Sequence, residues 1–310
     1  MIEDLGPLGT LWDLLSDESC ALAEEMDFLD DSYWELGNRI GAFFAGLHSG
    51  DTVKKITTDD AVAQTLSHSL THGLVHDAAV VPLLERMKKY GIANAEKLQA
   101  RVSEAYKAPA ILERFALGDC HPGAFLVQGW RELPFSLEGD GARTVAVIDW
   151  EFSHVKGQGV DGDIAQLLAS LYCHLTASNV DGPRWTGTYS FMQGLSNGYG
   201  KAAEFNRKEA VESDGGQRTR LQLLRSSMIL YGREIINQVF EREAAWAANE
   251  ATLTEMVAEG ALYIDLAGGD TDEMLKNFER MRDHDFFLVN LFGWGKQEPE
   301  GWEYTPPVPV

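Results

Sequence analysis

The chain has 310 residues, of which 45% are apolar, and its formal net charge is −22. A chain of this length can bury a substantial core, and no stretch is a linker long enough to separate two domains, so we expect one large domain. The acidity excludes nucleic-acid partners, because binding a phosphate backbone requires a basic face that 26 Lys and Arg among 48 acidic residues could hardly form.

The cysteines and the apolar residues predict a cytoplasmic protein that contacts no membrane. The three cysteines include no C-x-x-C pair, so a disulfide framework is not expected. No basic segment followed by an apolar one opens the chain, and no run of 18 apolar residues occurs. The negative charge suits a cationic small-molecule metabolite as partner, although acidity also keeps ordinary cytosolic proteins soluble, and that simpler explanation weighs more.

The apolar pattern predicts a mainly helical chain. A helix is expected over residues 32–48, with one apolar side formed by Leu36, Ile40, Phe43, Phe44 and Leu47. Further helices are expected over residues 164–175, 189–205, 218–246, 250–266 and 271–284. An irregular tail is expected from residue 293 to the end.

Short strands are predicted between these helices. The apolar runs 111–117 and 125–127 flank a loop that contains Gly and Pro, and the β-branched run 144–148 ends at Asp149. A hairpin from 125–127 through a glycine-rich turn and back to 145–148 would place Asp119 and Asp149 at one end of a small sheet. The pattern therefore predicts a site that contains both carboxylates.

Two acidic motifs in this region resemble those of a known superfamily, the aminoglycoside phosphotransferases and choline kinases. The catalytic loop of that superfamily reads H-G-D-x-H-x-x-N, and its metal motif reads I-D-W/F-E, often followed by G and by a D-[IL]-A that opens a helix. This chain resembles the pattern, in the same order, in Gly118-Asp119, His121, Ile148-Asp149-Trp150-Glu151, Gly159 and Asp163-Ile164-Ala165. The resemblance covers roughly residues 2–180 and fades beyond.

The resemblance implies a fold and a role for each matched residue. The fold would be α+β and mainly α, a protein-kinase-like large lobe with a small β-hairpin sheet that carries the catalytic loop and the metal motif. Asp119 would be the general base, and Asp149 and Glu151 would hold Mg²⁺. His121 would brace the loop, and Asp163 would cap its helix and tie the catalytic loop in place.

The N-terminal segment resembles the hinge of the superfamily, whose strand contacts the base of ATP. On this resemblance Glu3 and Leu5 would contact the nucleotide. The single domain would then comprise a hinge-like segment, a catalytic core, a helical substrate-side region and a tail, at residues 1–30, 31–180, 181–292 and 293–310.

An uncovered hinge would expose apolar side chains. The side chains in question are Leu5, Leu8, Leu11 and Trp12. We therefore expect either a homo-oligomer or another partner that covers this surface.

Parts of the kinase machinery are missing from the sequence. In kinases a glycine-rich loop and a strand lysine hold the phosphates, and both precede the hinge. Here no lysine precedes Lys54. Leu117 replaces the leading His of the loop, and Ala124 replaces the Asn that helps to hold Mg²⁺. Because each lost contact costs about 100- to 1000-fold in rate, we expect a poor autonomous kinase, with ATP binding more doubtful than Mg²⁺ binding.

Two hypotheses about function remain open. The first is a small-molecule phosphotransferase of the aminoglycoside/choline kinase type that lacks the small lobe. The second is a kinase-derived scaffold that works without nucleotide, either as a pseudokinase binding module or as an enzyme that uses Asp119, Asp149 and Glu151 for acid/base catalysis on a metabolite. Likeness of fold does not decide between them.

Overall fold

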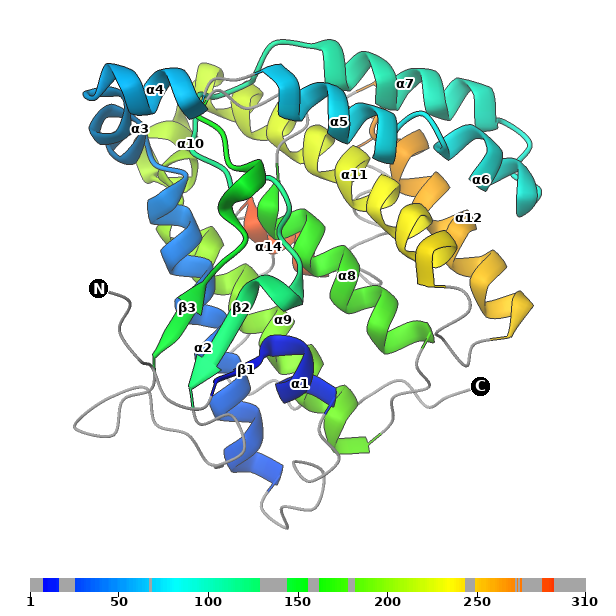
Figure 1. Cartoon of the computed structure of the whole chain (residues 1–310), viewed down its shortest axis with the longest axis horizontal. Helices are drawn as coiled ribbons and strands as arrows, with labels where there is room; N and C mark the ends of the chain where they lie inside the picture. The colour runs from blue at the N-terminus through cyan, green and yellow to red at the C-terminus, as the bar shows by residue number, and fades with distance from the viewer. Residues whose placement is uncertain are drawn as a thin grey trace.

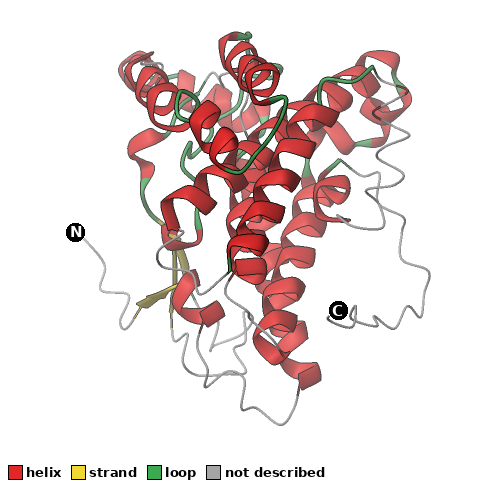
Figure 2. Ribbon diagram, turned by 90° about the vertical axis from the view of Figure 1, so that its right-hand side faces the viewer, coloured by secondary structure: helices red, strands yellow, loops and turns green. Residues whose placement is uncertain are grey.

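The structure is a computed structural model, and it describes residues 8–16, 26–66, 69–128, 144–155, 162–177, 182–242, 249–270, 272, 274 and 286–292. This part of the chain is mainly helical and contains one three-stranded antiparallel sheet, as the predicted α+β, mainly α class requires (Figure 1). The strands lie to one side of the helices (Figure 2).

The elements of the first half surround the sheet and extend away from it. In chain order they are β1 (Leu8–Thr10), α1 (Leu11–Ser16), α2 (Met26–Leu47), α3 (Gly50–Thr57), α4 (Asp60–Leu66), α5 (Ser69–Ala79), α6 (Leu83–Lys89), α7 (Ala95–Lys107), the 3-10 helix η2 (Pro122–Ala124), β2 (Phe125–Gln128), β3 (Val145–Val147) and the 3-10 helix η3 (Trp150–Phe152).

The second half is helical throughout its described part. Its elements are α8 (Asp163–Ala177), α9 (Gly182–Ala202), the 3-10 helix η4 (Glu204–Asn206), α10 (Lys208–Glu212), α11 (Asp214–Arg242), α12 (Glu250–Leu266) and α14 (Phe286–Leu291). The predicted helices 164–175, 189–205, 218–246 and 250–266 correspond to α8, α9, α11 and α12. The predicted helix 271–284 and the tail 293–310 lie largely outside the described residues. No described helix is both long and apolar enough to cross a membrane.

The sheet has the strand order β1-β2-β3. β2 and β3 form the predicted hairpin, with Phe125 opposite Val147. β1 adds a third strand on the other side of β2, with Gly9 opposite Val127, which the sequence did not predict. Phe125 and Val127 are fully buried, so this face of β2 is turned to the core.

Helices α2 and α9 lie side by side behind the sheet (Figure 1). Their backbones touch at glycines: a Cβ at Gly41 would lie 2.7 Å from the Tyr199 amide nitrogen, and one at Gly198 would lie 2.7 Å from the Asn38 carbonyl carbon. Any larger residue would force the two helices apart. Phe44 joins this pair to the sheet, since its ring centroid lies 5.9 Å from that of Phe125.

Helix α8 packs on α11, and α11 packs on α12. The closest approach of α11 and α12 is again glycine against glycine, because a Cβ at Gly260 would lie 2.7 Å from the Gly232 carbonyl oxygen. Helices α5, α6 and α7 cover another side of α11 (Figure 1). Arg86 there donates to Asn237 Oδ1 over 2.6 Å.

Most of the buried apolar residues belong to one cluster that reaches from Leu11 to Phe292. Two expectations about this core are wrong. Phe43, placed on the buried side of its helix, is 48% exposed, because α2 turns Leu36, Ile40 and Phe44 inward instead. Leu11, expected to be part of an uncovered hinge, is fully buried because α1 packs beneath η2.

Candidate functional site

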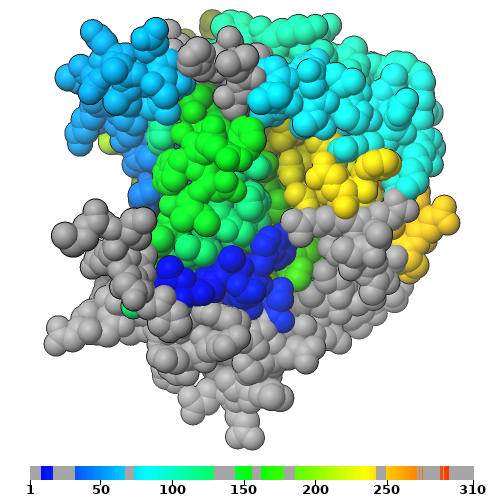
Figure 3. All heavy atoms as spheres, in the orientation of Figure 1, coloured from blue at the N-terminus to red at the C-terminus, as the bar shows by residue number. Residues whose placement is uncertain are grey.

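The two acidic motifs meet beside the sheet. Ala116 and His154 form an isolated antiparallel bridge that joins the chain before the first motif to the chain after the second. Gly118 lies where these two segments pass each other; it has φ +87°, and a Cβ there would lie 3.0 Å from the Phe152 carbonyl carbon. Both the dihedral angle and the lack of space require glycine. On the visible face, residues 8–16 (blue) lie directly against the green segments that carry the motifs (Figure 3).

Asp163, at the start of α8, holds the first motif in place. Its Oδ2 accepts a hydrogen bond from Leu117 N (2.7 Å), and its Oδ1 accepts one from Gly118 N (3.0 Å). His48 Nε2, at the end of α2, donates to the same carboxylate over 3.0 Å. Burial opposes ionisation of Asp163, but the hydrogen bonds and charge of His48 and the two amides hold its pKa below the ordinary value. The predicted role of Asp163 in tying the loop is confirmed.

Asp119 follows directly after this anchored segment. Its side chain is half-buried, and its Oδ1 accepts a hydrogen bond from Gln166 Nε2 over 2.9 Å. Burial raises the pKa of Asp119, and the charges of Glu234 and Asp149 act in the same direction, whereas His121 and Gln166 oppose the increase. A carboxyl group with a raised pKa is better matched to proton transfer near neutral pH than an ordinary aspartate.

His121 connects the two motifs. Its Nε2 lies 3.2 Å from Asp149 Oδ2, and its Nδ1 accepts a hydrogen bond from Gly123 N over 3.1 Å. Because Nδ1 is an acceptor, the proton of the neutral ring must sit on Nε2 and point to Asp149. Both ring nitrogens are therefore occupied, and His121 braces the loop as expected.

The second motif is held in a constrained turn. Asp149 has φ 68°, in the left-handed region that non-glycine residues seldom adopt, and it directly precedes η3. Trp150 stacks on Phe115 with 5.8 Å between the ring centroids and donates from Nε1 to the Val147 carbonyl (2.8 Å). Strain of this kind is found mostly at functional sites. Glu151, two residues further along the chain, is exposed.

The structure thus links Asp119 and Asp149. Asp119 and Asp149 share His121 as a neighbour, and the Asp149 charge is close enough to affect Asp119. Glu151 lies two residues from Asp149 in the chain and is exposed, and its place in this group stays a prediction. The predicted nucleotide contacts Glu3 and Leu5 lie outside the described residues.

No three His, Cys, Asp or Glu side chains in the described ranges are arranged to hold a metal ion together. Ala124, which is fully buried, offers only a methyl group where the superfamily has Asn. Mg²⁺ keeps several waters and takes one or two carboxylates. The Asp149 side chain is 38% exposed, and its Oδ2 contacts His121.

Sequence reasoning missed several residues that shape this site. Gln166 contacts both Asp119 and the loop backbone, and its only signal in the sequence is its position one helical turn after Asp163. Arg233 and Glu234 form a buried ion pair on α11 (2.9 Å) whose charges reach Asp119. Nothing in the sequence of α11 indicates that these charges would face the loop.

No model of a known protein family matches the chain, and no curated protein matches it either.

Proposed function

We propose that the chain acts on a small polar metabolite through Asp119, as a protein of the small-molecule phosphotransferase type. The observation that carries the proposal is the shared histidine: His121 lies in the loop of Asp119 and contacts the carboxylate of Asp149. The order of the matched motifs supports the same kinase-like reading of the fold.

In this proposal Asp119 is the catalytic residue. Its Oδ2, which forms no hydrogen bond with another described residue, accepts the proton. A substrate hydroxyl within hydrogen-bond reach would give its proton to Oδ2 while its oxygen electron pair attacks the γ-phosphorus of ATP. The bond from that phosphorus to the β,γ-bridging oxygen would break, and ADP would leave with the electron pair of that bond. Asp163 and His121 do not touch the substrate, and they hold the loop that carries Asp119.

The charges near Asp119 favour a cationic substrate. Asp149 and Glu234 both add negative potential at Asp119, and Arg233 is already engaged by Glu234. A protonated amine near Asp119 would relieve the repulsion between these carboxylates. We therefore propose an amine or an aminosugar, rather than a phosphorylated or carboxylated metabolite, as the acceptor.

A second candidate function is acid/base catalysis or binding without nucleotide. The raised pKa of Asp119 favours it, because burial that raises the pKa of a carboxyl group makes it better suited to act as a general acid. Ala124, which stands where the superfamily has a magnesium-binding Asn, is a further reason to test this alternative directly.

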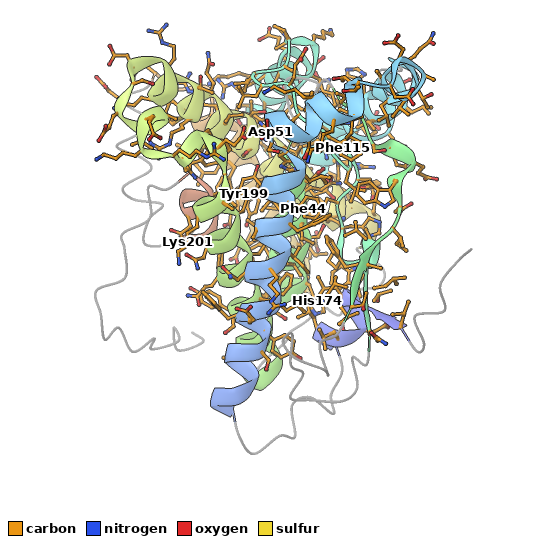
Figure 4. The ribbon with its side chains drawn as sticks, turned by 90° about the vertical axis from the view of Figure 1, so that its left-hand side faces the viewer. Phe44, Asp51, Phe115, His174, Tyr199 and Lys201 are labelled. Carbon is orange, nitrogen blue, oxygen red and sulfur yellow. The ribbon has the colours of Figure 1, made fainter. Side chains whose placement is uncertain are left out.

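Calorimetry of the purified chain with Mg·ATP separates the two. The phosphotransferase proposal expects heat of binding that disappears in Asp149→Ala and persists in Asp51→Ala, a control whose carboxylate is 77% exposed on α3 (Figure 4). A flat titration up to millimolar Mg·ATP would rule out phosphoryl transfer by the chain alone.

The second candidate is tested with a panel of small amines and aminosugars in the absence of ATP and Mg²⁺. It expects binding or turnover that falls in Asp119→Asn. Equal behaviour of wild type and Asp119→Asn would remove the acid/base role.

A further inference from the structure

We infer that Gln166 is a positioning residue that fixes which oxygen of Asp119 handles the proton. Its side-chain amide contacts two consecutive residues of the catalytic loop: Nε2 donates to Asp119 Oδ1 (2.9 Å), and Oε1 accepts from Cys120 N (3.1 Å). The inference deepens the proposed function but concerns a contact that exists without any ligand.

The orientation of the Gln166 amide is determined by its two partners. If the amide were turned over, its oxygen would face a carboxylate oxygen and its NH₂ group would face the Cys120 N–H. Both contacts would then be repulsive. Gln166 is only 7% exposed, so water does not readily substitute for either partner. One orientation satisfies every group.

This contact makes the two oxygens of Asp119 unequal. Oδ1 receives the Gln166 N–H in both the ionised and the protonated form of the carboxyl group, so the proton resides on Oδ2. A carboxylate free to rotate would present either oxygen to a substrate. The hydrogen bond from Gln166 leaves only Oδ2 available to the substrate, which lowers the entropy that the carboxylate loses on reaching the transition state.

Gln166 and Asp163 act from the same turn of α8. Asp163 holds the amides of Leu117 and Gly118, and Gln166 holds the amide of Cys120 and the side chain of Asp119. The first turn of α8 therefore grips four consecutive loop residues. Helix α8 therefore fixes the position of the loop that carries Asp119.

Three variants separate positioning of Asp119 from support of the backbone. Gln166→Leu has a similar volume and loses both hydrogen bonds. Gln166→Glu keeps an acceptor for Cys120 N–H but places a carboxylate oxygen against Asp119 Oδ1. Ser170→Ala is the matched control, since Ser170 lies one turn further along α8, is 1% exposed and makes no hydrogen bond through its hydroxyl within the described part of the chain.

The readout is the ¹³C carboxyl titration of Asp119 in protein labelled at aspartate Cγ, with the resonance assigned by its loss in Asp119→Asn. We expect the pKa of Asp119 to rise in Gln166→Leu, because a hydrogen bond to the charged form is lost, and to rise further in Gln166→Glu, because two carboxyl groups then share a proton. Ser170→Ala should leave the titration unchanged.

Amide hydrogen exchange at Cys120 completes the test. We expect faster exchange in Gln166→Leu but near wild-type exchange in Gln166→Glu, although the latter changes the Asp119 titration most. If Gln166→Leu does not fold, Gln166→Glu alone decides. An Asp119 titration in Gln166→Glu that matches wild type would overturn the inference, whether or not the chain proves to transfer phosphate. Where turnover is found, kcat should fall by up to about 100-fold with little change in KM.

Discussion

Replacement of Asp163 by alanine is expected to destabilise the folded chain more than replacement of an exposed residue by alanine. The carboxylate is 2% exposed and accepts hydrogen bonds from Leu117 N, Gly118 N and His48 Nε2. Its removal leaves buried donors without a partner. Loss of one member of a buried charged group costs about 3–5 kcal/mol, and we expect the free energy of unfolding to fall by that amount.

Two control variants, one isosteric and one at an exposed residue, test this estimate of the stability loss. Asp163→Asn keeps the shape but turns an NH₂ group toward donors, so its cost should be intermediate, about 1–3 kcal/mol. Asp51→Ala removes an exposed carboxylate and should change the free energy of unfolding by less than about 0.5 kcal/mol. Urea denaturation followed by circular dichroism measures all three, and amide exchange at Leu117 and Gly118 reports whether the loss is local.

The pH dependence follows from the same contact. The pKa of Asp163 is lower in the folded chain than in the unfolded chain, so its contribution to stability is present above the unfolded value of about 3.9 and is lost as the pH falls through the folded value. The stability difference between wild type and Asp163→Asn should therefore shrink in acid. A cost of less than about 1 kcal/mol for Asp163→Ala at pH 7 would refute the assigned role.

Three further predictions concern the site and its scaffold. Asp119→Asn should raise the urea midpoint at pH 7, because the pKa of Asp119 is higher in the folded chain than in the unfolded chain, and its ionisation therefore destabilises the folded chain above the unfolded pKa of about 3.9. This gain in stability should vanish below that pH, and a lower midpoint at pH 7 would contradict the prediction. Gly41→Ala should cost about 3 kcal/mol or prevent folding, because its Cβ would clash with the backbone of α9. Gly73→Ala, whose Cβ would have no atom within 4 Å, should instead stabilise α5 by about 0.5–1 kcal/mol. Equal effects of the two variants in thermal denaturation would refute the contact of α2 with α9. Gly118→Ala should displace the loop and accelerate amide hydrogen exchange at Cys120, because its Cβ would clash with the backbone of Phe152. Unchanged exchange would contradict this prediction.

The hairpin and the second-half helices could be predicted because their signals are local. The β-branched run at 144–148 and the apolar run at 125–127 specify strands, and the stretch 250–266 gave the bounds of α12 without error. The loop that carries Asp119 was predicted for the same reason, since Gly and Pro interrupt the apolar pattern on either side of Asp119. The strand predicted before it, over 111–117, is wrong, because this run forms only an isolated bridge at Ala116.

The contacts that organise the site could not be predicted from periodicity. The pairing of β1 with β2 and the bond of His48 to Asp163 join residues far apart in the chain, and no local pattern encodes them. Phe43 shows the limit within a single helix: it fits the apolar stripe of α2, yet α2 buries Leu36, Ile40 and Phe44 and leaves Phe43 exposed.

The central claim is that Asp119 and Asp149 belong to one site, and the titration of Asp119 in an Asp149→Asn variant tests it most directly. Burial contributes most to the raised pKa of Asp119, and the Asp149 charge adds to it, so replacing that charge by a neutral amide should lower the pKa of Asp119. Asp51→Asn, which removes an equal charge from the exposed surface of α3, should leave it unchanged. An Asp119 titration that is identical in Asp149→Asn, Asp51→Asn and wild type would contradict the claim.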